Sequence, residues 1–243
     1  MVYKGSRMTL SRTIPCLVLL SVLAAGVADA QPKDGGVQKE RVRVAVLPFE
    51  PSVSDPDLKL FGQGLSALMI NDLTGWDQVR VVERERIEEV MGELKLGETR
   101  FADKSSFAKI GKGLGVRFLV LGILLRDPKT KAPVIVARLV DTEVWDIRGI
   151  PRVIAADDDV LAAIDTLSAS AGKLLASLAS VTERAEPEKK TWKLPAKTLQ
   201  NYARALEAKD KKDTATATKL LTDVVKETPD FKLAQLDLLS LTK

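Results

Sequence analysis

The first candidate for chemistry is the run Glu83-Arg84-Glu85-Arg86, which sets two carboxylates beside two guanidinium groups. Paired carboxylates do general acid–base work, so Glu83 or Glu85 could serve a carboxylate-dependent hydrolase. The run also follows an apolar strand pattern and opens a helical one, where acidic residues and ion pairs stabilise the first turn. We therefore interpret it as structural, with an ion pair at the end of the strand.

Two other motifs have the residue types of a ligand site but the wrong spacing. The run Gly111-Lys112-Gly113-Leu114-Gly115 lacks the four residues between glycines that a phosphate loop requires, and a helix rather than a strand precedes it. Asp157-Asp158-Asp159 lacks the alternating ligands and closing glutamate of a calcium loop. The glycines instead indicate the end of a helix, and the aspartates the start of one.

The composition narrows the possible chemistry further. The chain of 243 residues contains no histidine and one cysteine, Cys16. Ser-His-Asp, Cys-His and His-metal arrangements are therefore excluded, and no serine has an activating group nearby. We expect a protein that is not an enzyme and that uses no cofactor and no metal.

Residues 1–30 have the pattern of a secretory signal peptide. Lys4, Arg7 and Arg12 precede an apolar run from Ile14 to Val27, and Ala28-Asp29-Ala30 supplies a cleavage site. The run is shorter than the ~20 residues that span a bilayer. Cleavage would leave a net charge of +2, and no basic cluster alternates with aromatic residues, so we expect export without nucleic-acid binding.

Cys16 lies inside the apolar run, because Leu17 to Leu23 follow it. Bacterial lipidation instead places the cysteine after that run. We therefore expect Cys16 to be removed with the signal peptide and the exported chain to carry no lipid. The predicted location is the periplasm, with association to the outer membrane left open.

Hydrophobic patterns predict an α/β domain over residues 41–180. Alternate residues of Arg41–Phe49 fall on opposite faces, as in a strand. The other expected strands are Val79–Val82, Phe118–Leu125, Pro133–Asp141, Val144–Ile147 and Arg152–Ala155, and the expected helices are Asp57–Leu73, Glu83–Leu94, one from Ser105 and one from Val160. The order β-α-β-α-α-β-β-β-α predicts a mixed sheet flanked by helices.

A second, all-α part follows the domain. Residues 183–193 are charged and contain Pro187, which is typical of a linker. Residues 194–243 then show three helical stretches, and the pattern from Thr198 to Phe231 predicts one tetratricopeptide-like unit with a capping helix. One such unit is rarely stable alone, so this tail must pack on the α/β domain, on a second copy or on a partner.

Four series in their order resemble the curli-secretion (CsgG) family. They are Val44-Ala-Val-Leu-Pro-Phe49, the helix with Leu65 to Leu73, Val81-Val-Glu-Arg84 and Leu119-Val-Leu-Gly122. The resemblance covers about residues 41–178 and extends to relatives of the family, the amino-terminal domains of TolB-type proteins and the outer-membrane activators of penicillin-binding proteins. It implies the family's α/β fold.

The sequence departs from the channel-forming members of that family. Those members insert long segments that become transmembrane β-hairpins. The corresponding connections here, Arg126–Ala132 and Gly149–Asp157, are too short for two strands of ~9–11 residues each. The family fold is therefore expected, and pore formation is not.

Together these features predict an exported, non-enzymatic envelope adaptor. The resemblance implies partners among secretion, peptidoglycan-synthesis or outer-membrane assembly components, with a homo-oligomer possible. The alternative is an oligomeric outer-membrane secretion component of the curli-channel type. Candidate interface residues are Glu83 and Arg84 at the family motif, Trp192 in the linker and Tyr202 in the tail.

Overall fold

The computed structural model describes residues 41–76, 79–94, 104–179 and 190–242. The predicted signal peptide and most of the predicted linker lie outside the described residues. The strands are β1 (Val42–Val46), β2 (Glu50–Pro51), β3 (Val79–Val81), β4 (Phe118–Arg126), β5 (Pro133–Asp141), β6 (Asp146–Gly149) and β7 (Val153–Ile154). The helices are α1 (Pro56–Thr74), α2 (Arg84–Glu93), α3 (Lys104–Leu114), α4 (Leu161–Ala179), α5 (Ala196–Asp210), α6 (Thr214–Glu227) and α7 (Lys232–Leu241).

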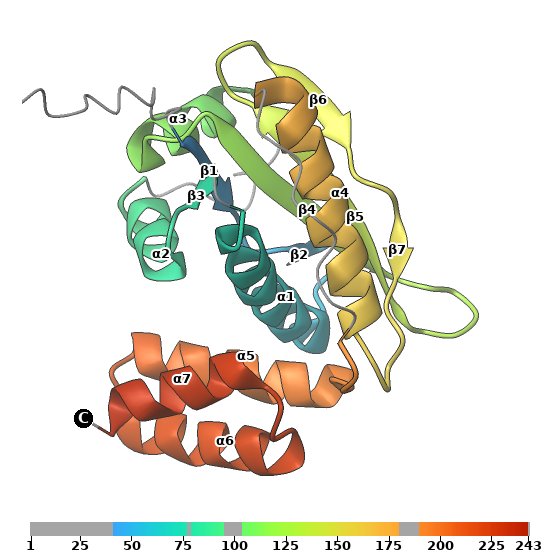
Figure 1. The fold of residues 1–243 in the computed structure, drawn as a ribbon, viewed down its shortest axis with the longest axis vertical. Coiled ribbons are helices and arrows are strands. Elements are labelled where there is room, and N and C mark those ends of the chain that lie inside the picture. Colours follow the sequence, from blue (N-terminus) through green and yellow to red (C-terminus); the bar gives the residue numbers. More distant parts are fainter. Residues whose placement is uncertain (1–40, 77–78, 95–103, 180–189, 243) are drawn as a thin grey trace, which may run out of the picture. The chain divides into compact units, whose positions relative to one another are not determined.

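The strands form one mixed sheet, as the sequence predicts (Figure 1). Its order is β3-β1-β4-β5-β6, with β2 beside β4 and β7 beside β5. The β1 strand pairs in parallel with β3 and β4, whereas β5 runs antiparallel to β4 and β6. The two-residue β2 was not predicted, because so short a segment carries no alternation.

The alternation of β1 divides the core into two layers. Val44 and Val46 face the cluster that contains residues of α1 and α4, whereas Ala45 and Leu47 face the cluster that contains residues of α2 and α3. Helices therefore cover both faces of the sheet, and the two-faced pattern expected for the first strand is confirmed.

The α4 helix is long and apolar enough to span a bilayer, but buried core helices also have that length and composition.

Local signals fix the ends of several helices. Asp55 precedes α1, and its Oδ1 accepts a hydrogen bond from the Leu58 N–H at 3.0 Å. Gly115 ends α3 with φ of 62°, a left-handed conformation that favours glycine, so the glycine run is a helix terminus as predicted. Asp159 accepts from the Leu161 N–H at 3.0 Å, which supports the helix-start interpretation of the aspartates.

One strand lies further along the chain than predicted. The expected strand Val144–Ile147 is β6 at Asp146–Gly149, because a turn follows β5. The carboxylate of Asp141 accepts from the N–H groups of Glu143 and Val144 and organises this turn. Trp145 then adopts φ of 60° before β6 begins.

The helical tail packs on the α/β domain of the same chain through α5, and α6 and α7 pack in turn on the tail (Figure 1). Leu199 of α5 lies against Gly64 of α1, and a Cβ added at Gly64 would come within 2.6 Å of Leu199 Cδ1. Residues of α5, α6 and α7 share one hydrophobic cluster with α1 and α4. Among the three alternatives for the tail, the structure selects the domain itself.

Candidate functional site

The contact between the tail and the domain contains a partly exposed ion pair. The two terminal nitrogens of Arg84, at the start of α2, donate to the carboxylate oxygens of Asp210, at the end of α5, at 2.6 and 2.7 Å. The Arg84 side chain is 14% exposed. Burial disfavours its charge, but the hydrogen bonds and charge of Asp210 outweigh that effect and raise the pKa of Arg84.

A second set of contacts stabilises the packing of the tail helices on one another. Tyr202 donates its hydroxyl to Asp237 of α7 at 2.7 Å, and Lys209 donates to the same carboxylate at 2.9 Å. The ring of Phe231 lies between Tyr202 and Trp192, with centroid distances of 4.9 and 5.9 Å. Burial, together with the charge and hydrogen bond of Asp237, raises the pKa of Tyr202 well above its ordinary value.

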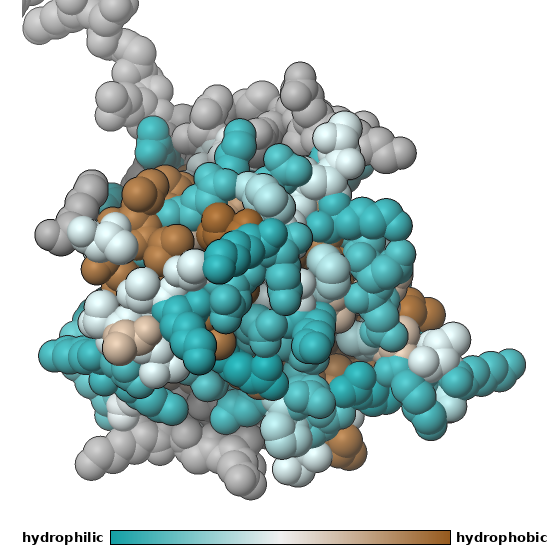
Figure 2. Space-filling model, turned by 90° about the horizontal axis from the view of Figure 1, so that it is seen from below, coloured by the Kyte–Doolittle hydropathy of each residue, from teal (hydrophilic) through white to brown (hydrophobic). Residues whose placement is uncertain are grey.

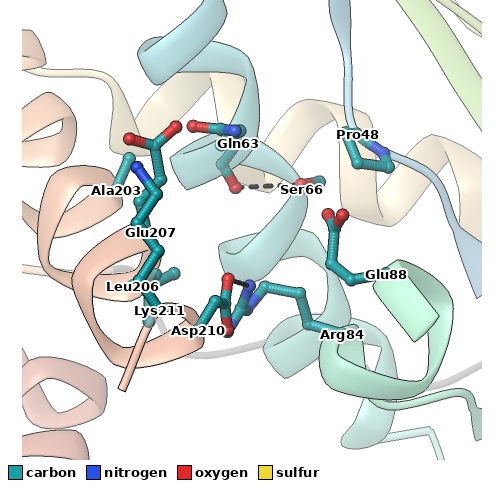
Figure 3. Close-up of a pocket in the computed structure, with 10 residues that line it drawn as sticks. All are labelled: Pro48, Gln63, Ser66, Arg84, Glu88, Ala203, Leu206, Glu207, Asp210 and Lys211. Atoms are coloured by element: carbon teal, nitrogen blue, oxygen red, sulfur yellow. Dashed lines mark hydrogen bonds and ion pairs between the residues drawn. The ribbon is translucent and has the colours of Figure 1, made fainter. Parts of the chain in front are cut away.

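A small cavity of about 190 Å³ lies where α5 meets the domain (Figure 3). It adjoins the carboxyl ends of β1 and β3, the edge at which open α/β sheets commonly bind ligands. Its lining residues come from the β1–β2 connection and from α1, α2 and α5: Pro48, Gln63, Ser66, Arg84, Glu88, Ala203, Leu206, Glu207, Asp210 and Lys211. Gln63 Oε1 is buried with no hydrogen-bond partner in the described part of the chain.

Several polar groups around this cavity are hydrogen-bonded to one another. Asp210 is engaged by Arg84, and the Ser66 hydroxyl donates to the Gln63 carbonyl oxygen at 2.9 Å. Asp72, whose pKa is raised by burial despite the charge of Lys190, contacts Lys190 and does not line the cavity. The described residues contain no group of acidic side chains that could bind a metal.

The predicted interface residues lie around this junction in different environments. Glu83 is exposed at the start of α2, and Arg84 pairs with Asp210. Trp192 is half-buried against Phe231, whereas Tyr202 is 1% exposed. Nothing in these positions decides whether they contact a partner, so their interface role stays a prediction.

Sequence reasoning missed the partners of these residues. Lys209 and Asp210 lie among other charged residues at the end of α5, and Asp237 lies in the mostly apolar α7. None of the three carries a local sequence feature that identifies its partner. The sequence contained only a weak indication of these partners. Lys209 lies within the tetratricopeptide-like pattern and Asp237 follows it, and Tyr202 in that pattern requires a buried hydrogen-bond partner for its hydroxyl.

The fold and this junction define a mixed α/β domain that carries a fixed helical tail. Residues 29–126 match the family model described as "Curli production assembly/transport component CsgG". This part of the chain is therefore CsgG-like, and the resemblance predicted from its motifs is confirmed. No curated protein matches the chain.

The following three solved structures are among those similar to the chain. The C-terminal domain of LpoB from Salmonella enterica has 11% identity and a TM-score of 0.35, covering 48% of this chain and 84% of that one. TolB from Acinetobacter baumannii has 11% identity and a TM-score of 0.36, covering 58% of this chain and 29% of that one. Lipoprotein GNA1162 from Neisseria meningitidis has 16% identity and a TM-score of 0.39, covering 56% of this chain and 99% of that one.

Proposed function

We propose that this protein is an exported, non-enzymatic adaptor of the periplasm that binds other envelope proteins. The CsgG family match and the signal-peptide pattern of residues 1–30 support the envelope location. The absence of histidine from the sequence and the structural use of the ion pairs at the junction support a role without catalysis. Partners would be secretion, peptidoglycan-synthesis or outer-membrane assembly components.

The observation that carries the proposal is an apolar stripe on the last helix of the tail. Leu236 and Leu239 of α7 are 62% and 58% exposed, and Leu233 is partly buried beside the core. Figure 2, which views the molecule from the side of the tail, shows apolar side chains gathered in one area of a mainly hydrophilic face. A soluble domain rarely exposes such side chains together without a partner.

The spacing of this stripe specifies the chemistry of the occupant. Leu233, Leu236 and Leu239 recur every three residues, so they lie along one face of α7. A stripe of this width fits the apolar face of one amphipathic helix. The fixed tail would then hold that partner helix at a defined position relative to the α/β domain.

In-cell photo-crosslinking tests this function. A benzoylphenylalanine placed at Leu239 should capture one envelope protein, identified by mass spectrometry, and the same residue placed at Lys226 on α6 should not. Lys226 is exposed and provides the matched control. The further substitution Leu236→Ser should weaken capture from position 239. Capture that is equal at both positions, or that survives Leu236→Ser, would exclude the α7 surface as the adaptor site.

The family match also favours a second candidate, an oligomeric outer-membrane secretion component of the curli-channel type. Against membrane insertion, the β4–β5 connection is a closed turn in which Asp127 Oδ1 accepts from the N–H groups of Lys129 and Thr130. Size measurement separates the candidates. A monomer in both buffer and detergent excludes the ring, whereas a large detergent-stable assembly excludes the monomeric adaptor.

A further inference from the structure

A basic groove lies at the amino ends of β1 and β4, at the edge of the sheet opposite the tail contact. Its volume is about 730 Å³. The groove is lined by four cationic side chains, Arg41, Arg43, Lys112 and Arg117, and by one carboxylate, Glu143. The net charge of its lining is therefore +3, or +2 when the buried Asp141 that contacts Arg117 is included, in a chain whose total is only +4.

The internal contacts of the four cations leave much of this charge uncompensated. Arg117 is held by Asp141 at 2.7 Å and by Glu143 at 3.3 Å. Arg43 donates to the neutral carbonyl oxygen of Leu114 at 3.2 Å. Within the described ranges, no carboxylate pairs with Arg41, Arg43 or Lys112, and all three are exposed. Lys112 also lies in the last turn of α3, which the helix dipole favours, but that does not explain the two arginines.

The groove combines this charge with an apolar floor. Val116 and Phe118 are buried beneath it, at 6% and 0% exposure, and the Arg117 guanidinium lies 4.9 Å from the Phe118 ring centroid. Carboxylates can accept hydrogen bonds from guanidinium groups in two-point geometry, while small apolar side chains can contact the half-buried Val42 and Ala108 that also line the groove. An acidic peptide with interspersed apolar residues satisfies both features.

We infer that this groove binds an acidic, extended peptide segment of the protein's envelope partner. The inference rests on the proposed adaptor function and adds a second contact, distant from the α7 stripe. Carboxylates of the segment would pair with Arg41, Arg43 and Lys112, and the charge of the groove would increase the association rate. The α7 surface supplies apolar contact area, and the groove supplies charge selectivity.

Fluorescence anisotropy with the full exported chain tests the inference. The probe is a fluorescein-labelled peptide of repeated Asp-Leu-Glu triplets. The double variant Arg41→Glu/Lys112→Glu should weaken its binding by about 10-fold or more, since two favourable charge pairs become repulsive. The matched control Lys219→Glu/Lys226→Glu makes the same change of net charge on α6 and should weaken binding by about 2-fold at most.

The conservative variant Arg41→Lys/Lys112→Arg should retain binding, and about a tenfold rise in salt should weaken it, because the Debye length shortens about threefold. Equal losses in the groove and α6 variants would overturn the inference, as would binding that both variants leave unchanged. Groove-dependent binding to phosphatidylglycerol vesicles without binding to the peptide would also overturn it. Crosslinking from position 239 does not involve the groove. If the peptide does not bind the groove, the adaptor proposal is therefore still tested by the crosslinking experiment.

Discussion

Arg84 and Asp210 make two hydrogen bonds of 2.6 and 2.7 Å across 126 residues of sequence. The pair joins the first turn of α2 to the last residue of α5. It therefore ties the carboxyl edge of the sheet to the helical tail, at the site where the family motif Val81-Val-Glu-Arg84 ends. The adaptor function proposed above would require this connection to hold the tail in place.

The Arg84–Asp210 pair should contribute measurably to stability. Arg84 is 14% exposed and Asp210 36%, so removing Asp210 leaves a mostly shielded guanidinium without its partner. A double-mutant cycle with Arg84→Ala and Asp210→Ala should therefore give a coupling free energy of about 1 to 2 kcal/mol. Urea unfolding followed by tryptophan fluorescence measures it.

The matched control for that cycle is the ion pair of Arg86 and Glu89 in the same helix, whose side chains are 50% and 57% exposed. Its coupling should be below about 0.5 kcal/mol, as is usual for exposed pairs. Equal coupling free energies for the two pairs would show that the Arg84–Asp210 pair does not stabilise the attachment of the tail.

Gly64 should be required for the close approach of α1 and α5. A Cβ at this position would lie 2.6 Å from Leu199 Cδ1 and 3.0 Å from the Leu199 carbonyl oxygen, so Gly64→Ala forces the helices apart. We expect a loss of about 1 to 3 kcal/mol in the free energy of unfolding. Limited proteolysis should also release the tail faster.

The control for Gly64 is Gly92→Ala in α2, where an added Cβ meets nothing within 4 Å. There the higher helix propensity of alanine should raise stability by up to about 1 kcal/mol. A Gly64→Ala variant as stable as wild type, with an intact tail, would contradict the packing of α5 on α1.

Patterns that act over short distances made much of the fold predictable from the sequence. The alternation of β1, the glycine at position 115 and the exact bounds Pro133–Asp141 of β5 each follow from side chains within one element or its flanks. The shift of β6 depends on a side chain outside that strand, because Asp141 organises the turn before it. A window centred on Val144–Ile147 contains no sign of that hydrogen bonding.

The junction was less predictable for the same physical reason. Arg84 and Tyr202 could be selected from the sequence as unusual residues, but their partners Asp210 and Asp237 could not. A carboxylate at the charged end of a helix has no local sequence feature that identifies a guanidinium 126 residues away as its partner. The packing of α5 on α1, which Gly64 permits, brings Arg84 and Asp210 together, whereas the packing of α5 and α7 within the tail brings Tyr202 to Asp237.

Alkaline pH should destabilise the tail through Tyr202. Burial and Asp237 raise the pKa of this hydroxyl in the folded state, so its stabilising contribution is complete below about 10, the ordinary tyrosine value, and is lost as the pH rises toward the folded-state value. The chain contains two tyrosines, Tyr3 and Tyr202, and only Tyr202 remains after removal of residues 1–30. Tyrosinate absorbance should therefore appear together with unfolding.

Substitution of that tyrosine separates its titration from general alkaline unfolding. Tyr202→Phe keeps the ring against Phe231 and removes the ionisable group, so its stability should fall less between about pH 9 and 11 than that of the wild type. The variant should lose about 1 kcal/mol at neutral pH from the missing hydrogen bond to Asp237. Free titration of Tyr202 near its ordinary pKa in the folded protein would refute its burial.

Acidic pH should act through Asp141, which is 1% exposed at the end of β5. Burial disfavours its charge, but Arg117 and the N–H groups of Glu143 and Val144 outweigh burial and lower the pKa of Asp141. Its contribution is therefore complete above about pH 4, the ordinary aspartate value, and is lost as the pH falls through the lower folded-state value.

The variant Asp141→Asn keeps an acceptor for the turn and loses the charge that Arg117 contacts. It should reduce the free energy of unfolding at pH 7 by about 1 to 3 kcal/mol. The difference from wild type should shrink below about pH 4, because protonation neutralises the wild-type carboxyl as well. Asp146→Asn is the matched control, since its Arg148 pair is more exposed and should be worth less than about 1 kcal/mol. A difference at Asp141 that stays constant down to low pH would mean that its carboxylate charge does not stabilise the turn.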